Sequence, residues 1–331
     1  MQNLYSSNAK SRKLFYYLQS IPLVFFLPSI ISRLSLQQIL KNNNSKREYI
    51  ESRVKYYLKT NANFEVSKKS KNASELLWSQ ISKNKQNSHF IDFYLLLKFF
   101  NHKNKVDFIY STKDYIDSTI AKQHPAYPTF VKSRPIGSDN QNSILLKLNQ
   151  IKLFHFIKDS KKFENKKNQA VWRGDIRNNF IRKYFVKNFY NTPLFDIGQT
   201  SPKQDVACMK SFMSIKDQLD YKFIFCLEGK CISTNLYWAM SSNSVCVMPK
   251  PKYESWFMEG KLIDGVHYIK VKDDFSDAKE KIEFYMNEND KCIEIINNAQ
   301  KFVRQFKDLK QERLIQLLIL KQYFKSTGQY E

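Results

Sequence analysis

The second half of this 331-residue chain predicts an α/β fold, because strand and helix patterns alternate from residue 170 onward. Short apolar runs bounded by Gly, Pro or Asp predict five strands, at residues 170–175, 192–199, 221–229, 244–249 and 267–272. Between them, helical patterns lie at residues 178–189, 209–218, 233–242 and 277–287. This alternation is typical of a parallel sheet covered on both faces, most simply a Rossmann-like domain.

The first half of the chain is less regular. Residues 36–60 predict a helix, because their apolar side chains recur at helical spacing. Residues 90–100 are so apolar that periodicity leaves both a buried strand and a buried helix open, whereas residues 106–111 predict a strand. The prolines in 124–136 predict an extended, irregular segment, and regular structure returns over residues 144–157.

A lysine-rich run from Lys161 to Lys167 separates the two patterns and predicts an exposed linker. We therefore expect an N-terminal domain over residues 1–160 and a C-terminal Rossmann-like domain over 161–300. Residues 301–331 predict a final helix that packs back on the N-terminal domain. Two domains also suit the length of the chain.

The charge of the chain restricts its partners. The 54 Lys and Arg against 31 Asp and Glu give a net charge of 54 − 31 = +23. This balance favours nucleic acid, an acidic membrane surface or a phosphorylated ligand. The apolar content of 42% excludes a disordered basic tail. The 44 lysines are dispersed beside many asparagines, and only 10 residues are arginines, which indicates compositional bias as well as binding.

The cysteines and the N-terminal apolar run indicate the cellular compartment in which the chain is expected. Five cysteines without a C-x-x-C pair predict free buried thiols in a reducing compartment. The apolar run at residues 21–31 is too short to span a bilayer, contains Pro22 and Pro28, and precedes no signal-peptide cleavage site. Two interpretations of it stay open: a helix with basic flanks on an anionic membrane surface, or a buried first helix.

Two turns carry the residue types that bind phosphate. Rossmann-like domains bind ligands beyond the carboxyl ends of their strands. The turn W-R-G-D-I-R at 172–177 combines a glycine, which lets a ligand approach the backbone, with two arginines. The turn at 228–235 combines a glycine with the hydroxyl-capped start of a predicted helix, a favourable place for an anion. Neither is a Walker loop or a G-x-G-x-x-G fingerprint, and a turn of either kind alone is more often structural than functional.

The order of the motifs resembles glycosyltransferase family 90, in particular its bacterial lipopolysaccharide core members. The likeness covers roughly residues 105–305 and is carried by SRPI-x-x-DN-x-x-ILLKLN, WRG-x-x-R, KFIFCLEG-x-x-x-STN, SSNSVCVMPKPKYESWF and GVHYIKVKDDFSD. The resemblance implies a GT-B architecture, with two Rossmann-like domains facing a cleft. It also implies a UDP-sugar donor, no metal or other cofactor, and inversion at the anomeric carbon.

The same resemblance assigns ten residues to the donor site. They are Trp172, Arg173, Gly174, Arg177, Glu228, Gly229, Lys230, Ser233, Thr234 and Asn235. The diphosphate charge would fall to Arg173, Arg177, Lys230 and the helix start near Ser233. Asn235 stands where eukaryotic relatives have an arginine that is expected to meet the diphosphate. This chain must therefore use another cation or backbone donors there.

The transfer also needs a base that takes the proton of the acceptor hydroxyl. Eukaryotic relatives place the catalytic Asp in E-Y-x-D, upstream of Y-P-A-W, and this chain has D-Y-I-D at 114–117 before H-P-A-Y at 124–127. Asp117 is therefore the expected base, with Asp114, Asp139 and His124 as alternatives. By contrast, His267 and Trp256 fit core positions better than a catalytic or pocket role, and Asp273-Asp274 fits a helix cap better than a metal site.

Two functions follow from these patterns. The first is a hexosyltransferase that moves glucose or galactose from a UDP-sugar to a lipopolysaccharide or lipooligosaccharide core acceptor. It would be cytoplasmic and peripheral on the inner face of the bacterial inner membrane, which accounts for the basic charge and the apolar N-terminal stretch. The alternative is a basic nucleic-acid-binding protein without enzymatic activity. Dispersed lysines, scarce arginines and the lack of a reader motif disfavour that alternative, so we expect no nucleic acid partner.

Overall fold

The computed structural model describes residues 9–26, 46–60, 63–81, 88–108, 126–137, 140–177, 179–201 and 206–330. The chain divides into two compact units. The first, which we call the sheet unit, comprises Met1–Ala9, Phe154–Lys252 and Met258–Lys307. The second, the mixed unit, comprises Lys10–Leu153, Tyr253–Phe257 and Asp308–Glu331. The domain boundaries expected at residues 160 and 300 stay a prediction, because compactness does not establish which parts fold alone.

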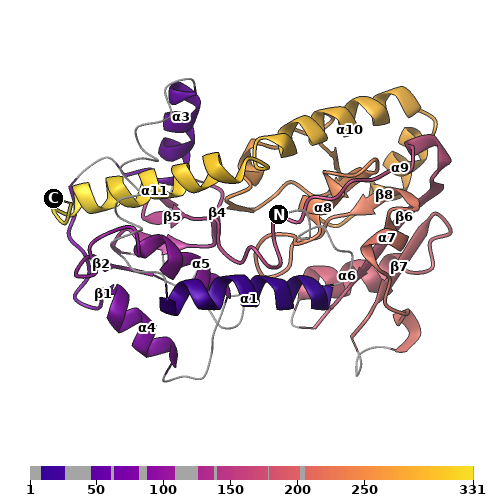
Figure 1. Ribbon diagram of the computed structural model, residues 1–331. Helices are drawn as coiled ribbons and strands as arrows, with labels where there is room; N and C mark the ends of the chain where they lie inside the picture. The colour runs from indigo at the N-terminus through magenta and orange to yellow at the C-terminus, as the bar shows by residue number, and fades with distance from the viewer. Residues whose placement is uncertain are drawn as a thin grey trace. The chain divides into compact units, whose positions relative to one another are not determined.

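The sheet unit is built on a five-stranded parallel sheet (Figure 1). In spatial order its strands are β7 (Phe195–Gln199), β6 (Lys167–Gly174), β8 (Tyr221–Phe225), β9 (Val245–Met248) and β11 (Ile269–Lys270). All four neighbouring pairs run parallel. Every residue of β8 and β9 is buried, so both faces of the sheet are covered. The predicted α/β class and all five predicted strands are confirmed.

Five α-helices of the sheet unit fall in the described residues. They are α6 (Phe180–Phe189), α7 (Ile215–Gln218), α8 (Leu236–Ala239), α9 (Ala278–Met286) and α10 (Asn289–Arg304). The predictions at 178–189 and 277–287 are confirmed by α6 and α9. The predictions at 209–218 and 233–242 were too long, because α7 and α8 have four residues each. Ser214 caps α7 late, and Asn235 bonds to a strand carbonyl instead of capping α8.

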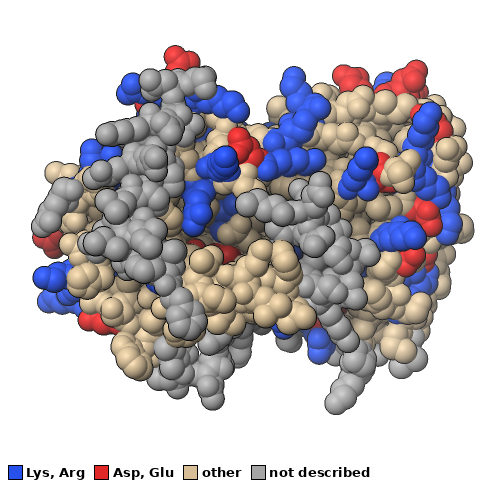
Figure 2. All heavy atoms as spheres, viewed as in Figure 1, with Lys and Arg blue, Asp and Glu red and all other residues tan. Residues whose placement is uncertain are grey.

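Helix α10 is amphipathic. One side buries Cys292, Ile295, Ile296, Ala299 and Val303. The last turn carries Lys301 and Arg304, and Figure 2 shows Lys and Arg side chains near that end of the helix. The final helix expected over residues 301–331 proves to be the end of α10 and a separate helix, α11 (Leu309–Ser326). The break comes at Asp308, whose side chain accepts from the amides of Lys310 and Gln311 and so starts a new helix.

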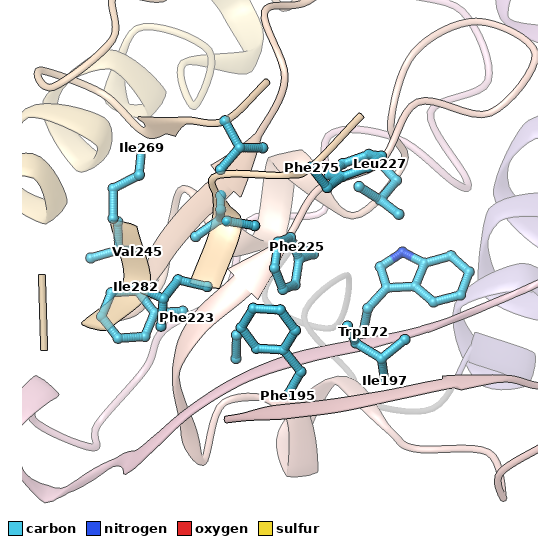
Figure 3. Close-up of a cluster of buried hydrophobic side chains, with 14 of the residues drawn as sticks. Trp172, Phe195, Ile197, Phe223, Phe225, Leu227, Val245, Ile269, Phe275 and Ile282 are labelled. Carbon is cyan, nitrogen blue, oxygen red and sulfur yellow. The ribbon is translucent and has the colours of Figure 1, made fainter. Parts of the chain in front are cut away.

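A cluster of aromatic and aliphatic side chains holds the sheet to its helices (Figure 3). Phe223 and Phe225 point from β8 to the same face, two residues apart, and Phe195 lies beside them on β7. The ring of Phe185 on α6 lies 4.8 Å from Phe225 and 4.6 Å from Phe275. Burying each such side chain contributes roughly 1.5–3 kcal/mol. This packing fixes where the strands end, and hence where the loops after them lie.

The mixed unit contains helices and short strand pairs. In the residues that the structure describes, its helices are α1 (Ala9–Phe26), α3 (Arg47–Tyr57), α4 (Ala73–Ile81), α5 (Ser88–Leu97) and α11. Its strand pairs are β1 (Lys71–Asn72) with β2 (Lys105–Val106), β3 (Thr129–Val131) with β5 (Ser143–Leu145), and β4 (Ser133–Pro135) with β10 (Tyr253–Ser255). The apolar run at 90–100 is thus mainly helix. Of the strand expected at 106–111, Val106 lies in β2 and Phe108 bridges to Phe130, while residues 109–111 lie outside the described ranges.

A buried charge network joins distant segments of the mixed unit. Glu312 on α11 pairs with Arg53 at 3.0 Å and with Lys147 at 3.5 Å, and it accepts a hydrogen bond from the indole of Trp256. The rings of Trp256 and Tyr57 stack with centroids 4.0 Å apart. Trp256 is fully buried, which confirms its core position. Because every charge in the network has a partner, its burial is tolerated.

Helix α1 docks by one side only. Tyr16 donates to the carboxylate of Asp92 on α5 at 2.7 Å, while Leu14 and Leu18 are 62% and 64% exposed. Among the described helices, none combines the length and the apolar character that crossing a bilayer requires. All five cysteines are buried and none forms a disulfide bond, as predicted.

Candidate functional site

The carboxyl edge of the parallel sheet has a topological switch point. In chain order the strands run 2-1-3-4-5 across the sheet, so the chain changes direction between β6 and β8. In open α/β sheets, ligands bind in the crevice outside the carboxyl ends of the strands at such a point. A pocket lies at this edge, lined by residues that follow β8, such as Glu228 and Ser233, and residues that follow β9, such as Lys250 and Lys252.

The pocket carries cations that the sequence pattern did not single out. Lys252 pairs with Asp273 at 2.9 Å, and its amide donates to the carboxylate of Glu228 at 3.0 Å. Lys250 is exposed, and no carboxylate of the described residues lies within ion-pair distance of it. The enclosed volume is about 30 Å³, so the pocket holds one group of a ligand rather than a whole nucleotide sugar.

Arg182 on α6 bridges the two strands of the switch point. Its guanidinium donates to the carbonyls of Leu227 at 2.9 Å and Glu228 at 3.2 Å, just beyond β8. It also donates to the carbonyl of Asp175, just beyond β6, at 3.4 Å. Burial lowers the pKa of Arg182. These three hydrogen bonds go to backbone carbonyls, which leaves the positive charge of the guanidinium available to an anion at this edge.

Two glycines make room for large side chains near the carboxyl ends of β6 and β8. A Cβ on Gly229 would lie 3.1 Å from Nη2 of Arg182, so glycine lets the guanidinium approach the loop. A Cβ on Gly174 would lie 2.6 Å from the indole of Trp172, which is buried and packs edge-on against Phe185. The space beside Gly174 is therefore filled by the protein's own tryptophan.

The two arginines of the W-R-G-x-x-R turn already have carboxylate partners. Arg173 pairs with Asp196 of β7 at 2.7 Å, and the exposed Arg177 pairs with Asp175 at 2.6 Å. Burial works to raise the pKa of Asp196, but hydrogen bonds from a lysine, a tyrosine and Arg173 outweigh it and hold that pKa low. The hydrogen bonds of Arg177 are the main cause that lowers the pKa of Asp175 to about 2.

The second predicted turn is a hydrogen-bonded loop. Asn235 donates to the carbonyl of Phe225 at 2.8 Å, and its amide oxygen accepts from Ser233 at 2.5 Å. Asn235 thus anchors the loop to the end of β8. The helix expected to start at Ser233 begins at Leu236 instead and has only four residues, so its dipole is too small to hold an anion. The role of Ser233 in the donor site stays a prediction. Thr234 is exposed, and Lys230 is half-buried.

Comparison with known proteins shows the family to which this chain belongs. The family model described as Glycosyl transferase family 90 matches residues 146–326, which include all five strands of the parallel sheet. The chain is 37% identical over 279 residues to O-glucosyltransferase LpsA of Dichelobacter nodosus, covering 84% of this chain and 83% of that protein. This chain belongs to glycosyltransferase family 90. It is also 30% identical over 115 residues to Uncharacterized protein 179R of Invertebrate iridescent virus 6, covering 33% of this chain and 10% of that protein.

The base expected in this family 90 member lies outside the described residues. Asp114, Asp117 and His124 fall within residues 109–125, and Asp139 falls within 138–139. Their assignment stays a prediction. His267, in contrast, is half-buried rather than in the core as predicted; its Nδ1 accepts from the amide of Ile263 at 3.0 Å, and burial lowers its pKa.

Asp273 and Asp274, the adjacent acidic residues of this family 90 chain, also have local partners. Asp273 pairs with Lys252, and Asp274 accepts from the amide of Ser276 at 3.0 Å. Asp277 occupies the cap position of α9 but accepts from the amide of Lys272 instead of capping with its side chain. Within the described ranges, no three His, Cys, Asp or Glu side chains gather closely enough to hold a metal ion.

Proposed function

We propose that this family 90 glycosyltransferase moves a hexose from a UDP-sugar to a lipopolysaccharide core acceptor, with inversion and without a metal. The observation that carries the proposal is the pocket at the switch point of the family 90 sheet, with Lys250 in its lining and Arg182 beside it. We further propose a GT-B arrangement in which this sheet holds the nucleotide. Membership in the family supports an enzyme, so binding of nucleic acid without catalysis is not proposed.

The donor would lie across the carboxyl ends of β6, β8 and β9. Of the apolar side chains that line the pocket, Ile181 is 38% exposed and can meet a flat ring, and the cations lie beside it. We propose that Lys250 and Arg182 supply much of the positive charge for the diphosphate, because Arg173 and Arg177 already have acidic partners. The ten residues predicted from the resemblance remain the proposed frame of the donor site.

The reaction then follows from two groups. A carboxylate, proposed to be Asp117, takes the proton of the acceptor hydroxyl as its oxygen forms a bond to the anomeric carbon. The bond from that carbon to UDP breaks in the same displacement, which inverts the configuration, and the diphosphate leaves with the electron pair. Fixed cations stabilise the charge that develops on the diphosphate, which is the task a metal ion performs in other transferases.

Glucose is the favoured hexose, and galactose is the alternative. A relative that spans most of this chain carries the name O-glucosyltransferase LpsA, which supports glucose and an acceptor in lipopolysaccharide. Such an acceptor is lipid-linked and anionic. The exposed apolar side chains of α1 and the net charge of +23 support attachment to the inner face of the bacterial inner membrane.

A UDP-release assay tests the proposal. The full chain is offered UDP-glucose, UDP-galactose, UDP-xylose and UDP-N-acetylglucosamine together with truncated core oligosaccharides and a chelator. We expect acceptor-dependent release of UDP from UDP-glucose, undiminished by the chelator. Release that requires added Mn²⁺ contradicts the metal-free mechanism, and release from none of the donors contradicts the UDP-sugar assignment.

A further inference from the structure

A second pocket opens at the opposite edge of the same sheet. Its lining includes Asp159, Leu219 and Asn243, which precede β6, β8 and β9 respectively, so it lies at the amino ends of the strands. It encloses about 810 Å³, within the range of ligand pockets and far more than the pocket at the carboxyl edge. All of its described lining residues belong to the sheet unit.

The floor of this pocket is a satisfied polar network. Asp159, the one carboxylate among the described lining residues, pairs with the buried amine of Lys166 at 2.7 Å and accepts from the amide of Asn243 at 2.9 Å. Gln300 donates to the side chain of Asn243 at 2.9 Å and to the carbonyl of Ser242 at 2.9 Å. These bonds fix the floor and neutralise the negative charge of Asp159.

Four cations line the pocket above this floor: Lys158, Lys216, Arg304 and Lys307. In the part of the chain that the structure describes, no carboxylate lies within ion-pair distance of any of them. Burial lowers the pKa of Lys307, and the nearby charge of Arg304 lowers it further. The dipole of α10 favours a cation such as Arg304 in its last turn, but Lys158 and Lys216 come from other segments. The helix end alone therefore does not account for the cluster.

Apolar side chains complete the lining, from Phe156, Ile157 and Ile215. A ligand that fits must combine negative charge with a body larger than an inorganic ion. We propose that this pocket binds the phosphate group of an organic phosphate, carried either on a sugar or on a lipid headgroup. The site goes beyond the proposed transfer reaction, because it lies at the opposite edge of the sheet from the donor pocket and uses none of its residues.

Calorimetry on the full chain tests the site with glucose 6-phosphate, glucose and inorganic phosphate as probes. We expect glucose 6-phosphate to bind and glucose not to bind. The double variant Arg304→Gln, Lys307→Gln removes two charged hydrogen-bond donors, and it should weaken binding by about tenfold or more. The matched control is Lys279→Gln, Lys301→Gln, which removes two exposed lysines of the same unit that do not line the pocket; it should bind within about twofold of the unchanged chain.

A vesicle arm separates the two sources of phosphate. If a lipid headgroup is the ligand, phosphatidylglycerol vesicles bind, phosphatidylcholine vesicles do not, and the pocket variant loses that binding while the control variant keeps it. Absence of glucose 6-phosphate binding, together with vesicle binding that is either absent or fully retained by the pocket variant, overturns the proposal. So does equal loss in both double variants, which would reflect net charge alone. UDP binding, measured in parallel, should be unchanged in both variants, so failure here leaves the proposed transferase function standing.

Discussion

Arg182 is the residue that ties the fold to the proposed chemistry. It reaches carbonyls beyond β6 and β8 at once, which a planar guanidinium can do and a single amine cannot. We expect Arg182→Lys to lower UDP affinity by about tenfold and the free energy of unfolding by about 1–3 kcal/mol, because buried carbonyls lose their donors. Calorimetry with UDP and urea unfolding measure both. The control is Arg47→Lys, which changes an arginine in an exposed ion pair with Glu51 on α3. It should change neither UDP affinity nor the free energy of unfolding.

Gly229 provides an independent test of the same contact. Gly229→Ala places a methyl group 3.1 Å from Nη2 of Arg182 and should displace the guanidinium. The expected loss of UDP affinity is about threefold to tenfold, smaller than that of Arg182→Lys because the cation stays nearby. In a double-mutant cycle the two losses should not add, since both remove one contact. Additive losses would show that Gly229 acts independently of Arg182.

Asp117 is the residue whose assignment rests on the resemblance alone. Asp117→Asn should reduce turnover by about 10²–10⁴-fold, because the amide cannot take the acceptor proton, while UDP affinity stays within about twofold. Asp114→Asn, Asp139→Asn and His124→Gln form the comparison set. The variant with the largest loss of turnover at unchanged UDP affinity identifies the base, and normal turnover in Asp117→Asn excludes that residue.

At the scale of elements, patterns that depend on local chemistry were predictable. Apolar runs such as residues 221–229 predicted strands correctly, because a central parallel strand is apolar on both faces. The lengths of α7 and α8 were not predictable, because side chains such as that of Asn235 bond to strands that are distant in sequence. The strand-or-helix choice for residues 90–100 likewise depended on packing partners rather than on periodicity.

The residues of the candidate site were likewise only partly predictable from the sequence. The sequence pointed to Glu228 and Ser233, because they follow a recognisable strand. It missed Lys250 and Lys252, since only the spatial order of the strands places the end of β9 beside the end of β8. Arg182 was missed because it lies inside a helix, where an arginine is ordinarily a surface residue.

The contact between α1 and α5 predicts a pH dependence. Burial raises the pKa of Asp92 to about 7, and hydrogen bonds from Gln150 and Tyr16 oppose that rise. A carboxyl with a raised pKa in the folded state binds more protons there than in the unfolded state, so its contribution to stability falls as pH rises from about 4 to about 7.

The variant Asp92→Asn should remove this slope. Each unit of raised pKa is worth about 1.4 kcal/mol of the dependence on pH. Urea unfolding of the unchanged chain and the variant, at intervals between pH 4 and pH 8, measures the difference. Parallel pH profiles would contradict the assignment of this dependence to Asp92.

For the whole molecule, a net charge of +23 and an exposed apolar face on α1 have one explanation if the acceptor is in a membrane. Charge attracts the chain to anionic lipid, and apolar side chains then enter the boundary between headgroups and acyl chains. Part of the positive charge also lines the two proposed anion sites, one at each edge of the parallel sheet. A dispersed excess of lysine is therefore compatible with specific anion sites that composition alone did not locate.

The membrane prediction can be tested without truncating the chain. Leu14→Gln, Leu18→Gln changes two exposed side chains, so the fold should be retained, while partitioning onto phosphatidylglycerol vesicles should fall by about tenfold or more. The control Ile263→Gln, Leu309→Gln removes two side chains of similar exposure, 56% and 49%, away from α1. If the two double variants lose vesicle binding equally, or neither loses it, α1 is not the anchor. Binding would then depend on positive charge, either dispersed or in the pocket beside Arg304, and should disappear at high salt for every variant.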